Sequence, residues 1–156
     1  MSLKARTING YSQELDEHLE GVGVLCKETI SRKDLSFTNI ADSKIEKMAY
    51  ILGVTHDFGK ATTYFQNYLK PKCKNPPKKR RRHSALSALF TYHVLGKEGF
   101  KNLLAILGWF VVQKHHGNLD NLFDRDGAIE TKANSLTQQS LIEEQVRNIK
   151  EYSLVD

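Results

Sequence analysis

Apolar residues recur at helical spacing along most of this chain, and two of the resulting stripes end in a histidine. Ile45 and Leu52 lie on the stripe that ends in His56, and Phe100 begins the one that ends in His115. Such a stripe buries one face of a helix, so its final histidine faces the core. The strict alternation that marks a strand is rare. The sequence therefore predicts an all-α bundle in which imidazoles meet at helix ends.

The predicted helix nearest the N-terminus runs from about Gln13 to Ile30. Leu15 and Val22 lie on its apolar face, and His18 falls at the edge of that face. A histidine in this position can point inward as a ligand, or it can be a core residue bonded to a backbone carbonyl. The helical pattern leaves both interpretations open.

The helix that ends at His56 has candidate caps at both ends. Asp42 or Ser43 can cap its start, and Glu46 completes a capping box with Ser43. At the other end, we expect Gly59 to adopt the left-handed conformation that closes a helix.

Two shorter helices are expected in the middle of the chain. The first, from Ala61 to Leu69, should bury Phe65 and Tyr68 and keep Gln66 near the surface. The second should begin with Ser84 as its cap and run to about residue 95.

The histidines around this second helix differ in their expected roles. His83 would lie just before its first turn, where the side chain can lean over the core. His93 falls late in the helix at its polar edge, and we interpret it as structural or exposed.

The stripe from Phe100 to His115 belongs to a helix that is apolar nearly all round, which predicts a central position in the bundle. It ends in Lys114-His115-His116-Gly117. After a loop rich in acids, a last amphipathic helix is marked by Leu136, Ile142, Val146 and Ile149.

Length and composition indicate a globular protein. The chain has 156 residues, of which 40% are apolar and 26% charged, and we expect a single domain over residues 1–156. The longest apolar segment, Leu103 to Val112, is about half the length of a membrane span, and no signal peptide is recognisable. With only Cys26 and Cys73, free thiols and a cytoplasmic location are expected, with no membrane partner.

One basic segment, residues 70–82, dominates the charge of the chain. It carries eight Lys and Arg residues and no acid, and its three prolines exclude a helix. Clustered cations favour a polyanion such as DNA, because binding releases counterions from phosphates. The alternative is a solvated, mobile loop that binds nothing specific. In either case, the prolines lead us to expect that the segment is disordered in isolation. The candidate nucleic-acid contacts are Lys74, Lys78, Lys79, Arg80, Arg81 and Arg82.

The adjacent residues His56 and Asp57 are the strongest sign of chemistry in the chain. An imidazole offers one nitrogen lone pair, and a carboxylate can bridge two cations. Either residue can also cap a helix or be solvated. Because separate helices finish in inward histidines, a metal site is the better interpretation.

Four motifs together resemble a known family. His56-Asp57-x-Gly-Lys is followed by Phe65-Gln66, then by His83-Ser84-x-x-Ser-Ala and by Lys114-His115-His116-Gly117. In this order, and with His18 ahead of them, they resemble the HD-domain nucleases of type I CRISPR interference, a branch of the HD phosphohydrolase superfamily. The resemblance extends from His18 to Gly117.

The resemblance implies a single-domain HD-type helical bundle with one or two metal ions at its helix ends. Asp57 would bridge the ions and act in catalysis with Lys60, which would lie near the scissile phosphate. Histidine-rich ligation favours manganese, nickel, cobalt or iron over magnesium. One ion would be held by His18, His56 and Asp57, and the second by Asp57, His83, His115 and His116.

The sequence departs from the family pattern in one respect. That pattern ends in a further aspartate, well downstream of His116, which completes the shell of the first ion, and no such residue can be placed here. Either the chain ends early, or Asp120, Asp124 or Asp126 takes this role. The site of the second ion is therefore better supported.

The substrate implied by the resemblance is single-stranded DNA in CRISPR antiviral defence, with RNA open as a second substrate. Because helicase motifs are absent from the sequence, a separate helicase subunit and the guide-RNA surveillance complex are the expected partners. Two alternatives remain. One is an HD phosphohydrolase acting on nucleotides, which has no use for the basic segment, and the other is a truncated or inactive module that docks on a helicase or guide-RNA complex.

Overall fold

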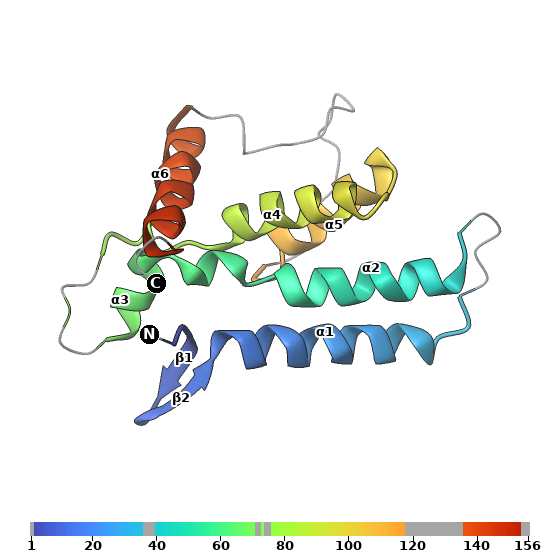
Figure 1. Cartoon of the computed structure of the whole chain (residues 1–156), viewed down its shortest axis with the longest axis horizontal. Coiled ribbons are helices and arrows are strands. Elements are labelled where there is room, and N and C mark those ends of the chain that lie inside the picture. Colours follow the sequence, from blue (N-terminus) through green and yellow to red (C-terminus); the bar gives the residue numbers. More distant parts are fainter. Residues whose placement is uncertain (1, 36–39, 71–72, 74–75, 118–135, 154–156) are drawn as a thin grey trace.

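The described chain consists of six α-helices, one 3-10 turn and one small hairpin (Figure 1). The computed structural model describes residues 2–35, 40–70, 73, 76–117 and 136–153. The all-α prediction is confirmed. In chain order the elements are β1 (Lys4–Ile8), β2 (Tyr11–Glu14), α1 (Leu15–Ser31), α2 (Asp42–Thr55), the 3-10 turn η1 (Phe58–Ala61), α3 (Thr63–Leu69), α4 (Ser84–Lys97), α5 (Asn102–Gln113) and α6 (Leu136–Ser153).

The helices α1 and α2 run antiparallel along the base of the molecule in Figure 1 and pack closely at two glycines. A Cβ atom on Gly53 would lie 2.5 Å from the Cα atom of Gly23. Only glycine permits two helix backbones to approach this closely. The close crossing brings the first turns of α1, which carry His18, beside the end of α2, which His56 follows.

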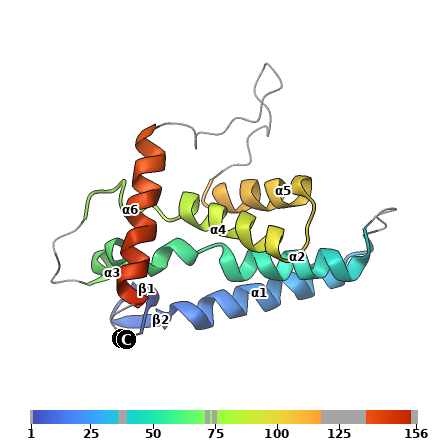
Figure 2. The same ribbon diagram turned by 45° about the horizontal axis from the view of Figure 1, so that its top comes forward.

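A second antiparallel pair, α4 and α5, lies over α2 (Figure 2). Ile51 and Leu95 belong to one buried apolar cluster, and Trp109 and Val112 belong to another. Leu52 packs against both clusters, so α2 forms the common floor of the core. The start of α4 and the ends of α2 and α5 consequently meet at one end of this core (Figure 1).

The helix α6, which the sequence also predicted, crosses the other helices steeply near the start of α4 (Figures 1 and 2). It is fastened to α3 by polar contacts. The Asn148 side-chain oxygen accepts a hydrogen bond from the Thr63 backbone N–H at 2.7 Å, and the Tyr64 hydroxyl donates to Glu144 at 2.6 Å. Thus α6 holds one side of α3 in place.

The hairpin of β1 and β2 was not predicted. Its turn is Asn9-Gly10, with φ values of 50° and 80°, and two positive φ values at the centre of a two-residue loop are typical of hairpin turns. The flanking strands are mostly polar, so their alternation is weak. As a result, the predicted first helix started too early, at Gln13, whereas α1 starts at Leu15.

The predicted helix caps are wrong at two helix starts. Ala41 is the N-cap of α2 and His83 is the N-cap of α4, and neither makes a side-chain capping bond. Asp42 and Ser84 are instead the first residues of the helices. Asp42 still favours the helix start, since its charge lies at the positive end of the dipole.

The central position predicted for the helix before His115 is also wrong. Two of its apolar side chains, Leu103 and Val111, are 64% and 44% exposed. Because α5 packs chiefly against α4, its opposite face is not covered by another described element. An apolar sequence alone did not reveal that this helix has an open side.

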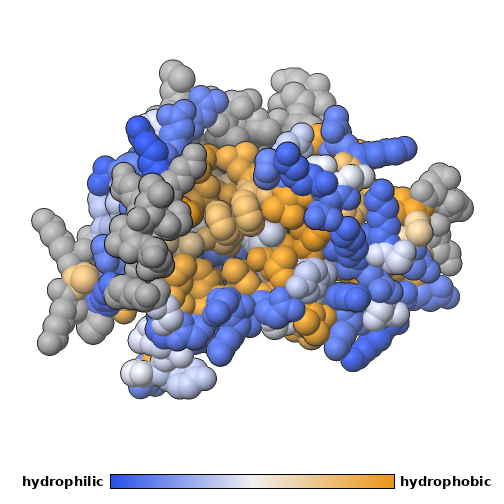
Figure 3. All heavy atoms as spheres, in the orientation of Figure 1, coloured by the Kyte–Doolittle hydropathy of each residue, from blue (hydrophilic) through white to orange (hydrophobic). Residues whose placement is uncertain are grey.

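Apolar side chains are also exposed over α4, in the middle of the face drawn in Figure 3. On α4, Leu89 and Tyr92 are 39% and 40% exposed. No described helix is long and apolar enough to cross a membrane. Cys26 and Cys73 are free thiols.

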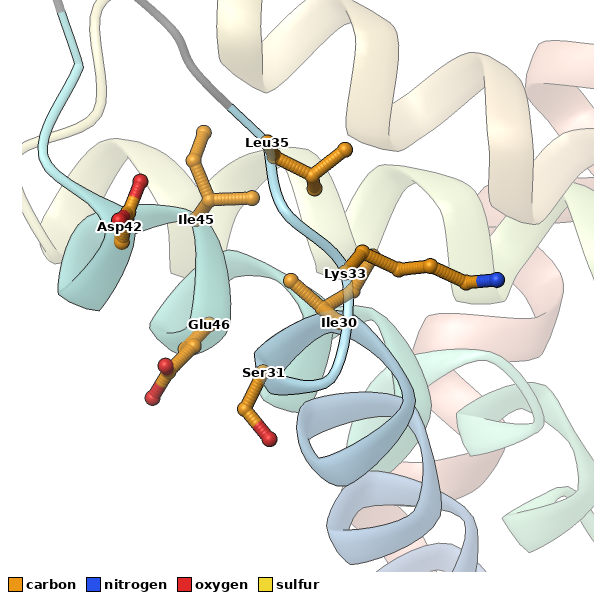
Figure 4. Close-up of a pocket in the computed structure, with 7 residues that line it drawn as sticks. All are labelled: Ile30, Ser31, Lys33, Leu35, Asp42, Ile45 and Glu46. Atoms are coloured by element: carbon orange, nitrogen blue, oxygen red, sulfur yellow. The ribbon is translucent and has the colours of Figure 1, made fainter.

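A small pocket of about 60 Å³ lies where the end of α1 meets the start of α2 (Figure 4). Ile30 and Ile45 line it together with Asp42, Glu46 and Lys33. The three charged side chains point in different directions in Figure 4, so they do not converge on a ligand.

Candidate metal centre

Three breaks in the helical structure place histidines around one carboxylate. His56 and Asp57 lie between α2 and η1, His83 precedes α4, and His115 and His116 follow α5. His18 reaches the same place from the second turn of α1. All six residues that the sequence predicted to converge are therefore brought together, and their role as metal ligands remains a prediction.

The Asp57 carboxylate lies at the centre of the cluster and is 2% exposed. Its Oδ2 atom is 3.1 Å from His18 Nε2 and 3.2 Å from His56 Nε2. Its Oδ1 atom is 2.9 Å from His83 Nε2 and 3.2 Å from His115 Nε2. Each carboxylate oxygen thus faces its own pair of imidazoles, which is the arrangement that a bridging ligand requires.

The potential ligand atoms form two sets, each with its atoms within 4.8 Å of one another. His116 joins the second set, and its Nε2 atom is 2.8 Å from His83 Nε2. The first ligand set consists of His18, His56 and Asp57, and the second ligand set consists of Asp57, His83, His115 and His116.

His56 and His115 are oriented by the same local device. The Nδ1–H of His56 donates to the Gly53 carbonyl at 2.6 Å, and that of His115 donates to the Val112 carbonyl at 2.5 Å. Each bond joins a histidine at a helix end to the carbonyl three residues earlier. A bond of this kind fixes the tautomer, leaving the Nε2 lone pair free for a cation.

The donor set passes a test of fit for a cation. With Nδ1–H already donating, the Nε2 atoms of His56 and His115 face Asp57 oxygens as acceptor against acceptor. Two acceptors near 3.2 Å repel each other unless a proton or a metal ion lies between them. Imidazole nitrogens with one shared carboxylate suit manganese, iron, cobalt or nickel.

Charges within the cluster shift several pKa values. Burial raises the pKa of Asp57, but the close contacts with His115, His56, His83 and Lys60 outweigh burial and hold that pKa well below its usual range. Burial and the neighbouring His115 and His83 lower the pKa of His116 to about 4. Asp57 is therefore ionised and His116 neutral at neutral pH, as ligands must be.

The two histidines of the first ligand set shift in opposite directions. Burial lowers the pKa of His18 and outweighs its hydrogen bond to Asp57. Burial also lowers the pKa of His56, but contacts with Asp57 and with the Gly53 carbonyl outweigh it, so this pKa is raised. His18 consequently offers the readier lone pair of the two.

Lys60 contacts the carboxylate from the side of the first ligand set. Its Nζ atom is 2.6 Å from Asp57 Oδ2, and its side chain is 12% exposed. The ammonium also lies over the Phe65 ring, 5.3 Å from the centroid. A fixed positive charge thus stands next to the carboxylate oxygen that His18 and His56 share.

Gly59 positions the loop that carries Asp57, but for a different reason than predicted. Its conformation is not left-handed, because only Gly10 and Gly99 have positive φ among the described glycines. A Cβ on Gly59 would instead lie 2.6 Å from the His83 carbonyl oxygen. Glycine therefore lets η1 pass directly beneath His83.

A buried chain of hydroxyl groups supports this loop. The Ser87 hydroxyl accepts a hydrogen bond from the Gly59 N–H at 2.9 Å, and the Thr91 hydroxyl donates to the Ser87 carbonyl at 2.8 Å. Thr55 meets Thr91 at 2.7 Å between their hydroxyl oxygens. This chain joins α2, α4 and η1, and no sequence pattern predicted it beyond the small residues of the Ser-Ala motif.

The predicted burial of α3 is wrong for two residues. Gln66 is 6% exposed, whereas Tyr68 is 42% exposed. The Gln66 amide donates to the carbonyls of Lys4 and Lys60, and its oxygen accepts from the Lys4 N–H. These bonds tie the hairpin to η1, which explains why a polar side chain is buried here.

Part of the basic segment is ordered rather than free. Residues 78–81 form a turn, and the side chain of Gln145, 1% exposed, donates to the carbonyls of Arg80 and Arg82 at 2.9 and 2.8 Å. Arg80 pairs with Glu144 at 3.1 Å. We call residues 78–82 the basic turn, and α6 holds it in place. The predicted disorder of the segment in isolation stays a prediction. Lys74 lies outside the described residues.

Among the described residues, the remaining candidate His93 does not join the cluster. His93 is exposed on α4 and belongs to neither ligand set, in agreement with its predicted structural or exposed character. Asp120, Asp124 and Asp126 lie outside the described residues.

An apolar groove of about 460 Å³ adjoins the cluster. It lies between α1, α2 and α5, where Val22, Leu25 and Val111 form its walls, and His56 and His115 line it too. Leu25 and Val111 are exposed, so the groove is open to solvent and gives the centre an apolar rim on the side of the two imidazoles.

Known proteins resemble this chain in sequence and in fold. Residues 12–153 match the family described as the HD domain of Cas3. A solved structure, the CRISPR-associated Cas3 HD domain protein from Methanocaldococcus jannaschii, has a similar fold, with a TM-score of 0.55 and 23% sequence identity over 90% of this chain and 85% of that chain. No curated protein matches the chain.

Proposed function

Because this chain belongs to the Cas3 HD-domain family, which forms the nuclease module of Cas3, we propose that it is a metal-dependent nuclease that hydrolyses phosphodiester bonds of single-stranded DNA in CRISPR interference. The observation that carries the proposal is the Asp57 carboxylate, whose two oxygens face separate histidine sets. This arrangement supports two cations bridged by one aspartate. RNA remains a second substrate to be tested.

The proposed ions are held by residues that are already oriented for them. The first ligand set would bind one ion through three residues, and the second ligand set would bind another through four. When bound, such ions lower the pKa of a water molecule and neutralise phosphate oxygens. Histidine-rich ligation favours manganese, nickel, cobalt or iron.

The side chains themselves supply orientation and charge. Hydrogen bonds to backbone carbonyls hold the rings of His56 and His115 in place. Their Nε2 lone pairs therefore need no reorganisation when substrate binds. The Lys60 ammonium stands beside Asp57, where it can stabilise negative charge that develops on the phosphate. His116 is the exposed member of the second ligand set and marks the open side of the centre.

The proposed partners follow from the family and the charge of the chain. A separate helicase subunit would deliver single-stranded DNA, and the guide-RNA complex would select it. The basic turn directly precedes His83 in the sequence. Its five cations are therefore close in the chain to a member of the second ligand set. We also propose that residues 1–156 form one HD domain that acts in the cytoplasm.

A cleavage assay tests this proposal. The purified chain should cut end-labelled single-stranded DNA in manganese or nickel and stop when EDTA is added. Asp57→Ala and His56→Ala should each lower the rate by about 100-fold or more, since both remove a ligand. The matched control is His93→Ala, which should cut like the parent and keep its metal content.

Two other outcomes would reject the proposal. If the two ligand variants behave like the parent on every substrate, the chain is an interaction module and not a nuclease. If a mononucleotide or cyclic nucleotide is hydrolysed faster than DNA, a nucleotide phosphohydrolase is the better assignment.

A further inference from the structure

An exposed aromatic ring lies beside the basic turn. Tyr68, on α3, is 42% exposed, and the guanidinium carbon of Arg81 lies 4.2 Å from its ring centroid. One helical turn earlier, Tyr64 meets Arg80 at 5.5 Å in the same way. Two tyrosines of α3 thus pair with two arginines of the basic turn.

The chemistry of this pair suits a nucleobase. Proteins that bind single strands combine cations that follow the phosphates with aromatic rings on which bases stack. Arg81 covers one side of the Tyr68 ring, and the exposed remainder leaves surface for a base. Within the described chain, no carboxylate pairs with Arg81, so its charge stays available to a phosphate. Arg80, in contrast, is already paired with Glu144.

A short ladder of rings connects Tyr68 with the candidate metal centre. The Tyr68 and Phe65 centroids are 6.0 Å apart, and Phe65 meets His83 edge-on at 5.3 Å. Phe65 is buried. Only one buried ring therefore separates the exposed tyrosine from a member of the second ligand set, and a strand bound at the centre passes within reach of Tyr68.

The surface is also fixed before any substrate binds. Gln145 holds the backbone on both sides of Arg81 through its bonds to Arg80 and Arg82. Thr62 caps α3 by accepting a hydrogen bond from Phe65 N–H. A preformed surface loses little conformational freedom on binding, which favours affinity.

We propose that Tyr68, backed by Arg81, is a stacking site for one base of the single-stranded substrate close to the scissile phosphate. The inference rests on the proposed nuclease function and extends it to a defined nucleotide contact. Because every base has an aromatic face, this site gives affinity and position without sequence preference.

Binding to two oligonucleotides tests the proposal. One carries a fluorescent label and normal bases, and the other has the same phosphates but lacks bases in its central stretch. Anisotropy titrations are run in EDTA so that nothing is cut. Tyr68→Ala should weaken binding of the normal strand by about 5- to 100-fold and leave binding of the abasic strand unchanged.

Two further variants separate stacking from folding. Tyr68→Phe keeps the ring and should bind like the parent, whereas Tyr92→Ala, which removes a comparably exposed tyrosine from α4, should have no effect. Equal weakening of both strands by Tyr68→Ala, or no weakening of either, would overturn the stacking site. A parent that binds and cuts DNA while Tyr68→Ala binds normally leaves the nuclease proposal intact and rejects this one alone.

Discussion

Lys60 makes the two ligand sets unequal. Its ammonium is 2.6 Å from Asp57 Oδ2, the oxygen that faces His18 and His56. A cation in the first ligand set would share that oxygen with a positive charge, whereas Oδ1 faces only His83 and His115 among the described residues. Two like charges at such a distance repel strongly in a partly buried site. The second ligand set should therefore bind its ion more tightly.

Replacing Lys60 by methionine should strengthen the weaker of two manganese-binding events. The expected gain is on the order of tenfold or more, because a nearby unit charge is removed. Calorimetric titration with manganese measures both events without any need for activity. The tighter event should stay as in the parent, and His93→Ala should leave both unchanged. Unaltered affinity of the weaker event in Lys60→Met would contradict this interpretation.

At the scale of single residues, helical phase and residue type predicted which histidines converge. His56 and His115 end apolar stripes, and each is placed by a bond to a carbonyl three residues earlier. Gln66 could not be predicted in the same way. Its burial depends on Lys4, 62 residues away in the chain, and a polar side chain on a short helix looks like a surface residue until that partner is known.

Among the elements, the contact of α4 with η1 controls how Asp57 is presented. Ser87 and Thr91 are fully buried on α4, and the Ser87 hydroxyl is the acceptor for Gly59 N–H. This bond, together with the stacked rings of Phe58 and Phe90, holds the loop that begins with Asp57 against the helix that begins after His83.

Ser87→Ala should lower the free energy of unfolding by about 1–3 kcal/mol, because Gly59 N–H loses its partner in a buried place. It should also weaken manganese binding, since Asp57 lies only two residues before Gly59 in the same loop. Urea unfolding and metal titration measure the two effects. Ser140→Ala, at an exposed site on α6, is the matched control. If Ser87→Ala unfolds like this control, the hydroxyl chain does not support the loop.

Element boundaries show where sequence patterns stop being informative. The sequence patterns located all six described α-helices, although the buried residue described on α6 is the polar Gln145 and Val146 is 36% exposed. It did not locate the hairpin, whose strands are polar and whose only strong signal is Asn9-Gly10. Periodicity also could not tell that α5 has an open face, since Leu103 and Val111 are as apolar as their buried neighbours.

Across the whole molecule, positive charge is concentrated beside the candidate metal centre. The basic turn is fixed by Gln145 of α6 and directly precedes His83. The length and composition of the basic turn were evident from the sequence, but its defined position against α6 was not. That position depends on α6, a helix that begins more than fifty residues later in the chain.

Four cations of the basic turn should contribute to the salt dependence of DNA binding. We select Lys78, Lys79, Arg81 and Arg82, because Arg80 is already paired with Glu144. Replacing these four by glutamine should weaken binding of single-stranded DNA and flatten the plot of log affinity against log salt. The slope should fall by up to about 3, since each contacted phosphate of a single strand contributes about 0.7.

The matched control replaces four exposed lysines at the opposite end of the helix pairs, Lys27, Lys33, Lys97 and Lys101. It changes the net charge by the same amount but removes no cation near the centre. If nonspecific attraction alone holds the DNA, the slope of log affinity against log salt will fall by the same amount in both variants. If the basic turn guides the strand, the slope will fall only in the variant of the basic turn. The manganese content of both variants should stay at the level of the parent. An equal loss of slope in both variants would therefore remove the basic turn from the substrate path.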